Sequence, residues 1–190
     1  RTLPARPTVV VATAGAEPSV DGGYACAIIL DAAALVGRPE LWAPEEAARR
    51  WLDALSLVRP GHPGLVVGTI PEALGQMLVR WSPTDYAQRL LDEREALGFF
   101  PACTMVALDG TAAQVRQVAD QVVREGGAEL VGTVAIPATR EGEQNQVRTL
   151  VRTPLPDTVA MLQALTDIRR SRSARKVPLV KMSVNPPELF

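Results

Sequence analysis

A chain of 190 residues with 47% hydrophobic and 22% charged residues has the composition of a globular protein, which excludes a fibre and an intrinsically disordered chain. The formal net charge is −1, but acidic residues predominate before residue 100 and basic residues after it. The sequence contains no run of about eighteen uncharged apolar residues and no signal-peptide pattern, so we expect a cytoplasmic protein without a membrane partner.

The first half of the chain has the pattern of an α/β region. Continuous apolar runs, typical of parallel strands buried on both faces, occur at residues 8–13, 25–32 and 64–69. Helical spacing of apolar residues predicts helices at 44–58, 71–81 and 82–98. The first of these helices starts well, because Pro44 has a suitable φ and the two acids after it favour the positive end of the helix dipole. A strand, a crossover helix and a strand in this order indicate α/β architecture.

The second half has a different order of elements. Strands are expected at 103–110, where the first ends in an Asp-Gly turn, and at 128–137, 146–153 and 178–186. Helices are expected at 111–127 and 156–171, and a polar loop at 139–145. Strand, helix, strand, strand, helix, strand is the βαββαβ order of a ferredoxin-like sandwich. We therefore expect a small α+β ferredoxin-like domain at 99–190, joined to residues 1–98 at a rigid apolar elbow that contains Pro101.

Residues that could bind a metal are few. Cys26 and Cys103 both lie in apolar, strand-like runs without a second cysteine at metal spacing, which favours core thiols. His62 is the sole histidine and sits in the turn RPGHPG, where an exposed side chain is expected. This pattern disfavours both a zinc site and Ser-His-Asp chemistry.

Three stretches carry a family resemblance. They are LLDEREALGFFPACTMVALDG at 90–110, ELVGTVAIP at 129–137 and SARKVPLVKMSVNPPELF at 173–190. In order and spacing they resemble the C-terminal part of the primosomal protein N′ (PriA) family of replication-restart DNA helicases. The resemblance covers nearly the whole chain. It implies that residues 1 to about 80 form part of a RecA-like helicase lobe with a parallel sheet, and that the protein serves primosome assembly at stalled forks in the nucleoid.

The motor motifs of that family are degenerate in this sequence. Only Thr13 matches the family's Gly-Thr-Gln segment, only Asp31 matches its paired acids, and only Arg59 matches its arginine-finger motif. We regard these three as a nucleotide-binding remnant, and we expect no helicase activity from this lobe because arginine fingers and phosphate ligands supply orders of magnitude in rate. ATP and zinc are cofactors that the family implies, but the sequence contains no P-loop and no paired cysteines, so we expect no cofactor in this chain.

Basic residues in the second half are the candidates for DNA contact. The set comprises Arg148, Arg152, Arg169, Arg170, Arg172, Arg175 and Lys176. The two on the strand at 146–153 are four residues apart, which places them on one face. Arginine suits multidentate phosphate contacts. The resemblance implies forked or single-stranded DNA, single-stranded DNA-binding protein and other primosome proteins as partners.

Other interpretations remain open from the residues alone. The same cations would also serve as solvated charges that keep a sheet soluble. The second half would then be a structural module that docks a protein. A small enzyme using residues 9–23 as a nucleotide loop is a third reading, but such a loop should lead directly into a helix, whereas a strand-like run follows.

Overall fold

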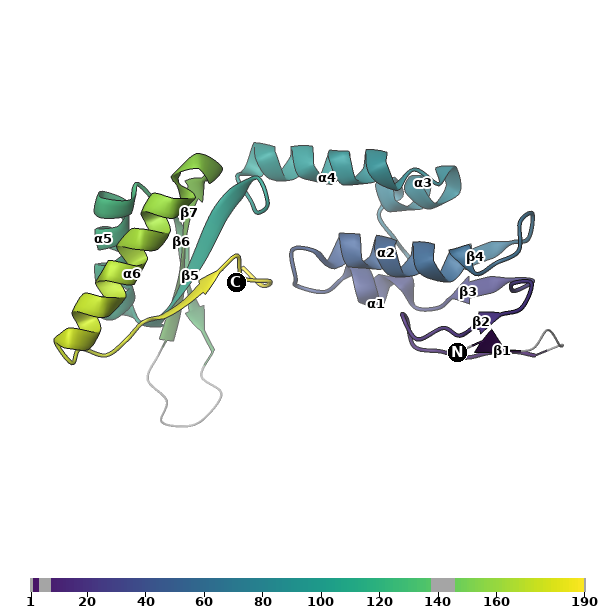
Figure 1. The fold of residues 1–190 in the computed structure, drawn as a ribbon, viewed down its shortest axis with the longest axis horizontal. Helices are drawn as coiled ribbons and strands as arrows, with labels where there is room; N and C mark the ends of the chain where they lie inside the picture. Colours follow the sequence, from purple (N-terminus) through teal and green to yellow (C-terminus); the bar gives the residue numbers. More distant parts are fainter. Residues whose placement is uncertain (1, 4–7, 138–145, 190) are drawn as a thin grey trace. The chain divides into compact units, whose positions relative to one another are not determined.

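The computed structural model describes residues 2–3, 8–137 and 146–189 and divides the chain into two compact units (Figure 1). Unit 1 is Arg1–Arg89 and unit 2 is Leu90–Phe190. The division falls inside helix α4 (Pro83–Leu97), earlier than the domain boundary expected after Gly98. The polar loop expected at 139–145 lies outside the described residues.

Unit 1 contains two short pairs of parallel strands. Its elements are β1 (Thr2–Leu3), β2 (Ser19–Val20), β3 (Ala27–Ile29), α1 (Ala32–Val36), α2 (Ala43–Ser56), β4 (Gly64–Val66) and α3 (Glu72–Arg80), followed by the start of α4. Strand β1 pairs with β2, and β3 pairs with β4. The chain between β3 and β4 forms α1 and α2. The expected order of strand, crossover helix and strand is therefore confirmed for β3, α2 and β4.

The sequence of α2 explains its start and its buried side. Proline stands in its first turn with Glu45 and Glu46 beside it, as the dipole of a helix favours. The carboxylate of Glu46 accepts hydrogen bonds from Arg49 and Arg50, which lower the pKa of Glu46 to about 2. On the opposite side of the helix, Trp51 is buried.

The strand expected at residues 8–13 is wrong. These residues belong to no strand of the structure, and the side chains of Val9 and Val11 are 90% and 93% exposed. The chain turns directly afterwards, where the amide of Ala16 donates to the carbonyl of Thr13 at 2.9 Å. An apolar run forms a buried strand only where a neighbouring strand and a second layer receive it, and no such partner is present for this run among the described residues.

Unit 2 is an antiparallel sheet with two helices on one face. After the end of α4 its elements are β5 (Cys103–Thr111), α5 (Ala112–Gly126), β6 (Glu129–Ile136), β7 (Gln146–Pro154), the 3₁₀ turn η1 (Leu155–Asp157), α6 (Thr158–Ala174) and β8 (Lys181–Val184). The strand order is β6-β7-β5-β8, with every neighbouring pair antiparallel. Figure 1 shows α5 and α6 on the same side of this sheet. The order of elements expected for the second half is confirmed.

The core of unit 2 lies between the helices and the sheet. Its fully buried members come from β5, α5, β7 and α6, namely Val106, Leu108, Val115, Val118, Val122, Val151, Met161 and Ile168. The antiparallel helices approach closely at Gly126, where an added Cβ would lie 3.1 Å from the Cα of Met161. A smaller cluster on the other face of the sheet joins Met105, Ala107 and Leu150. The two central strands, β5 and β7, are therefore covered on both faces.

One end of unit 2 brings four chain segments together. The end of β5, the start of α5, the end of α6 and the start of β8 meet there, as shown by contacts between Arg172 and Gln117 and between Lys181 and Asp109. The Asp-Gly turn expected at the end of the first strand is wrong, because Asp109 and Gly110 continue β5 and pair with Arg148 and Val147.

Candidate nucleic-acid interface

The basic residues predicted to contact DNA fall into two groups in the structure. Arg148, Arg152 and Arg172 direct their guanidinium groups into hydrogen bonds within unit 2. The other four are exposed around the end of α6, and they are Arg169, Arg170, Arg175 and Lys176. The two groups have different chemical possibilities, because only an exposed cation can approach a phosphate without first breaking an internal contact.

Arg148 forms a forked ion pair across the sheet. Its Nε and Nη2 donate to the two carboxylate oxygens of Asp109 at 2.9 and 3.0 Å, and its Nη1 donates to the carbonyl of Glu188 at 3.1 Å. The side chain of Asp109 is 7% exposed and that of Arg148 is 19% exposed. The hydrogen bonds and the charge of Arg148 hold the pKa of Asp109 below its ordinary value, and burial opposes them. The pair is a partly buried contact between β5 and β7.

Arg152 links the sheet to the end of α4. Its Nε donates to Glu129 of β6 at 2.9 Å, and its Nη1 donates to the carbonyls of Leu97 and Gly98 at 3.0 and 3.2 Å. Those carbonyls lack partners within the helix, and a cation at the negative end of the helix dipole is favourable. Gly98 has φ +65°, and an added Cβ there would clash with Nη1 of Arg152. Arg148 and Arg152 lie on one face of β7, as expected from their spacing, but each is committed to a partner inside the unit.

Arg172 is the buried member of the basic run at the end of α6. It is 7% exposed. Its Nε and Nη2 donate to the carbonyl of Pro178 at 3.3 and 2.8 Å, and its Nη1 donates to Oε1 of Gln117 on α5 at 2.9 Å. Both acceptors are neutral. Arg172 therefore ties the turn after α6 to α5 and to its own helix.

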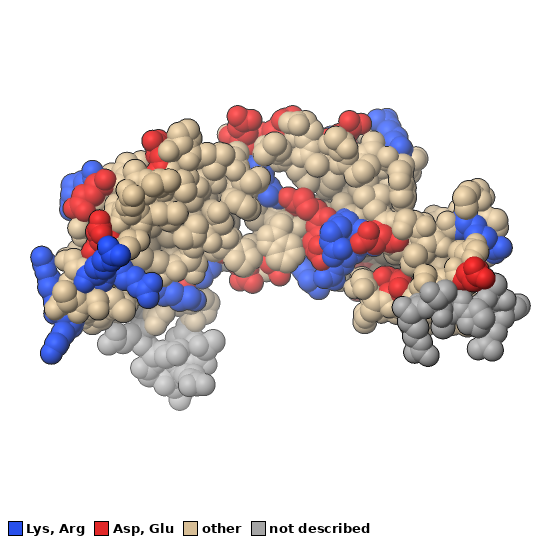
Figure 2. All heavy atoms as spheres, viewed as in Figure 1, with Lys and Arg blue, Asp and Glu red and all other residues tan. Residues whose placement is uncertain are grey.

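The exposed cations around the end of α6, together with Lys181 at the start of β8, form the surface that we call the basic pole. Its members are Arg169, Arg170, Arg175, Lys176 and Lys181. Figure 2 shows Lys and Arg atoms gathered where α6 ends. Within the described residues, Arg169, Arg175 and Lys176 have no ion pair, and Arg170 meets Asp167 only at 3.6 Å with both side chains exposed. Such an exposed pair contributes little and leaves the arginine available.

Lys181 belongs to the basic pole although the sequence analysis did not select it. Its side chain is 72% exposed, and its Nζ lies 3.7 Å from Oδ2 of Asp109, which Arg148 already neutralises. The signal in the sequence was its position at the start of the last strand, only five residues after Lys176. The contacts described for these five cations reach two acids, Asp167 at 3.6 Å and Asp109 at 3.7 Å, and Asp109 is already paired with Arg148. The excess of positive charge favours a positive potential at this end of unit 2.

The three residues of the nucleotide-binding remnant are not joined in the structure. Thr13 is exposed in a turn, Asp31 has φ 52° directly before α1, and Arg59 is exposed with its amide donating to the carbonyl of Tyr24. No hydrogen bond or ion pair that the structure describes connects any two of them. The described contacts therefore show no direct link among the three, and their assignment as a nucleotide-binding remnant stays a prediction.

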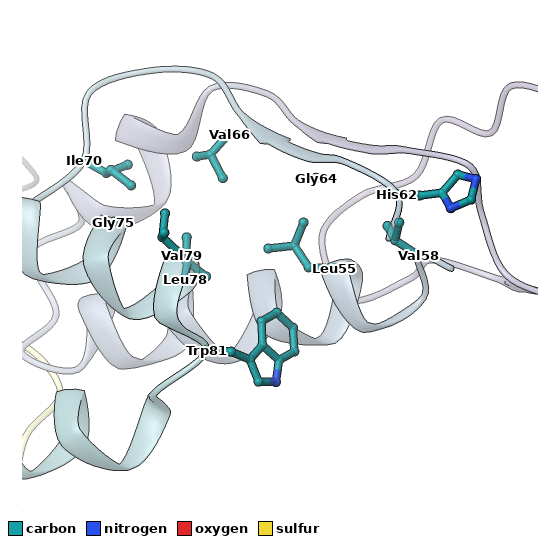
Figure 3. Close-up of a pocket in the computed structure, with 10 residues that line it drawn as sticks. All are labelled: Leu55, Val58, His62, Gly64, Val66, Ile70, Gly75, Leu78, Val79 and Trp81. Carbon is teal, nitrogen blue, oxygen red and sulfur yellow. The ribbon is translucent and has the colours of Figure 1, made fainter. Parts of the chain in front are cut away.

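A pocket of about 380 Å³ lies in unit 1 between α2, β4 and α3. Figure 3 shows aliphatic side chains, one tryptophan and a histidine around it, and the lining residues include Leu55, Val66, Ile70, Leu78 and Trp81. His62 lies at one edge and is exposed, as expected, with its Nδ1 3.2 Å from the carbonyl of Pro60. The pocket has no residue of the nucleotide-binding remnant in its lining.

The two cysteines have different environments. Cys103 is buried, as expected, and burial raises the pKa of its thiol, whereas Cys26 is exposed and its expected place in a core is wrong. The run that contains Cys26 continues into β3, and Ile28 of β3 and Leu65 of β4 are paired on an exposed face of that sheet. Among the described residues, no group of three or more His, Cys, Asp or Glu side chains could hold a metal ion. No helix in the same residues is long and apolar enough to cross a membrane.

Comparison with known proteins gives one family and several relatives. The model of the primosomal protein N C-terminal domain matches residues 95–187, which is most of unit 2. A probable replication restart protein PriA from Mycobacterium leprae (strain TN) is 42% identical over 136 residues, covering 70% of this chain and 21% of that protein. The protein of the same description from Mycobacterium tuberculosis (strain ATCC 25618 / H37Rv) is 45% identical over 116 residues, covering 60% of this chain and 18% of its own length. The matched part therefore spans about a fifth of these relatives.

Proposed function

The chain belongs to the PriA family, as a C-terminal region that carries a primosomal protein N C-terminal domain at residues 95–187, and from this premise we propose that it binds forked or single-stranded DNA through its basic pole. The relatives support a role in replication restart. In that role the chain would contact the phosphates of a stalled fork. Phosphate contacts hold a protein on DNA without reading sequence, which suits a protein that must recognise a fork anywhere in a genome.

The single observation that carries the proposal is the charge of the basic pole. Arg169, Arg175 and Lys176 are exposed cations without an ion pair in the described residues, and they stand beside the buried guanidinium of Arg172, whose hydrogen-bond acceptors are all neutral. Exposed charges that only confer solubility are usually interspersed with charges of the opposite sign. A cluster of one sign is instead the usual feature of a surface that neutralises phosphates.

The folds of the two units support this assignment. In unit 2, the strand order β6-β7-β5-β8 with two helices on one face fits a ferredoxin-like sandwich. In unit 1, the parallel pair of β3 and β4 joined through α2 fits part of a RecA-like helicase lobe. We infer that this lobe is a degenerate one, because the sequence keeps only Thr13, Asp31 and Arg59 of the family's motifs in this region. The function that we propose is binding, with no ATP hydrolysis by these residues.

Titration of a labelled fork with a single-stranded arm tests the proposal. The test variant carries Arg169→Gln, Arg175→Gln and Lys176→Gln. The matched control carries Arg38→Gln, Arg80→Gln and Arg124→Gln, which remove the same number of exposed charges elsewhere. Binding is measured at several salt concentrations, so that the slope of log K against log salt is obtained with each affinity.

We expect the control to keep most of the affinity of the unchanged chain. The test variant should lose about 100-fold in affinity at about 0.1 M salt, and its salt slope should fall by roughly 2, because each lost phosphate contact removes about 0.7 to 0.9 from that slope. Equal losses in the two variants would show a net-charge effect and would overturn the assignment of the basic pole. Absence of fork binding by the unchanged chain would overturn DNA binding itself and leave a protein-docking module.

A further inference from the structure

Arg172 differs from every other member of the basic run in its burial. Its position in α6 is four residues after Ile168 and seven after Leu165, so it continues the buried stripe of the helix. Arg169, Arg175 and Lys176 are exposed around it. A direct contact between Arg172 and a phosphate would require the guanidinium to leave this site.

The contacts of Arg172 do not include a carboxylate. Three donor nitrogens reach two neutral acceptors, the carbonyl of Pro178 and the side-chain oxygen of Gln117, and no ion pair of Arg172 occurs among the described residues. A buried charge that lacks an opposite charge is costly, and an apolar residue of similar volume is often as stable or more stable at such a site. Fold stability alone therefore explains poorly why an arginine stands here.

The turn that Arg172 holds carries two members of the basic pole. After α6, the amides of Arg175 and Lys176 donate to the carbonyls of Ser171 and Ser173 at 3.1 Å, and Lys176 has φ 54°. The amide of Val177 then donates to the carbonyl of Arg172 at 3.0 Å. Arg172 thus holds the turn through two groups. Its backbone carbonyl accepts from the amide of Val177, and its guanidinium donates to the carbonyl of Pro178.

We propose that Arg172 is a positioning residue for DNA binding, which fixes the turn at 175–178 so that Arg175 and Lys176 are presented together to phosphates. The inference rests on the proposed function of the basic pole. Arg172 contributes through the order of the turn and not through a contact of its own. Gln117 completes the arrangement, because its side-chain oxygen orients the guanidinium from α5.

A double-mutant cycle separates positioning from direct contact. Arg172→Met keeps an unbranched side chain and good helix propensity while removing the charge. It is measured in the unchanged chain and in a chain that carries Arg175→Gln and Lys176→Gln, with the same labelled fork. Arg124→Met, at an exposed position in the last turn of α5, is the matched control.

If Arg172 positions the turn, Arg172→Met weakens fork binding in the unchanged chain by about threefold to tenfold, at most the effect of one or two phosphate contacts at about 0.1 M salt. In the chain without Arg175 and Lys176 the same substitution changes the affinity by less than about twofold, because the two sites are coupled. Hydrogen exchange of the amides of Lys176 and Val177 becomes faster, while that of the strand amides stays unchanged. Arg124→Met alters none of these.

Other outcomes would overturn the inference. A loss of affinity of the same size in both backgrounds would make Arg172 a direct phosphate contact. A folded Arg172→Met variant with unchanged affinity would make Arg172 purely structural. If Arg172→Met does not fold by circular dichroism, the cycle is run with Gln117→Leu, which leaves Arg172 in place, and an additive or absent effect again contradicts positioning. The proposed function fails separately, when Arg169→Gln, Arg175→Gln and Lys176→Gln together leave fork binding unchanged.

Discussion

The ion pair between Asp109 and Arg148 should stabilise unit 2, and Asp109→Asn tests this directly. Asparagine keeps the shape of the side chain and one carbonyl oxygen, but it loses the charge and the second oxygen that accepts from Nη2 of Arg148. Arg148 then remains in a site where it is only 19% exposed. The substitution therefore leaves a partly buried cation without its opposite charge.

The magnitude follows from the burial of the two partners. Removing one partner of a fully buried pair costs about 3–5 kcal/mol, and exposed pairs contribute about 0–1 kcal/mol. Asp109 lies near the buried limit, but Arg148 keeps the carbonyl of Glu188 as an acceptor at 3.1 Å. We expect the free energy of unfolding of unit 2 to fall by about 2 kcal/mol, between these limits.

Urea denaturation of the full chain, followed by far-ultraviolet circular dichroism, measures this loss. Asp167→Asn is the matched control, because Asp167 pairs with Arg170 only at 3.6 Å and both side chains are exposed. It should leave the midpoint unchanged. A second comparison adds Arg148→Gln alone and together with Asp109→Asn, where we expect a coupling of about 1–2 kcal/mol. Equal stability of Asp109→Asn and the unchanged chain would refute the reasoning.

The pH dependence gives an independent check on the same pair. The pKa of Asp109 is lower in the folded protein than its ordinary value, so the unfolded chain binds this proton more readily. The contribution of the pair is therefore complete above the unfolded-state pKa of about 3.9, and it is lost as pH falls through the lower folded-state pKa. The difference in stability between the unchanged chain and Asp109→Asn should be constant near neutral pH and should narrow on acidification. A difference that widens on acidification would contradict this sign.

Gly98→Ala should destabilise unit 2 by about 1–2 kcal/mol, because the left-handed φ disfavours alanine. The added Cβ would also displace Arg152 from the end of α4. Thermal unfolding measures this loss, and an unchanged midpoint would contradict it. Leu150→Ala should cost about 2–5 kcal/mol in urea denaturation because Leu150 is fully buried, whereas Leu130→Ala on the exposed part of β6 should cost clearly less. Equal losses of stability in Leu150→Ala and Leu130→Ala would contradict the assignment of Leu150 to the core. Phosphate release from ATP should not exceed the buffer rate with or without forked DNA, and turnover by the purified chain would disprove the degenerate lobe.

The order of elements in unit 2 could be predicted from the sequence because its signals are local. Apolar residues at helical spacing mark α5, and Val115, Val118 and Val122 are indeed buried. The Asp-Gly pair at the end of β5 misled the prediction, since the same dipeptide is a strong turn signal. Here the strand continues because Arg148 lies directly opposite Asp109. Cross-strand register is non-local, so a single sequence does not show it.

The strand predicted from the first apolar run was wrong for a related reason. Residues 8–13 have the composition of a buried strand, but a strand also needs a neighbour to receive its hydrogen bonds and a layer to cover its side chains. Val9 and Val11 have neither in the described structure. The composition of a segment indicates that it can form a buried strand, but whether the strand forms depends on a neighbouring strand and a covering layer.

The candidate site was predictable as a region and not residue by residue. The run that ends α6 was visible from charge alone, and its four exposed cations lie where the sequence indicated. Helical phase could have separated Arg172, because it continues the apolar stripe of Ile168 and Leu165. Nothing in the sequence showed that Arg148 and Arg152 would meet Asp109 and Glu129. For Arg148, Arg152 and Arg172, DNA contact stays a prediction, and it would require each guanidinium to give up hydrogen bonds inside the unit.

The difference between the hydrogen-bonded and the exposed cations has an evolutionary consequence. A lysine has one compact ammonium group, whereas Arg148, Arg152 and Arg172 each donate from two or more nitrogens of the planar guanidinium group. An exchange to lysine at any of these three sites should be rare among homologous sequences. At Arg169, Arg170, Arg175 and Lys176 either residue would supply the positive charge that the proposed phosphate contacts need, so the two should alternate freely from one species to the next.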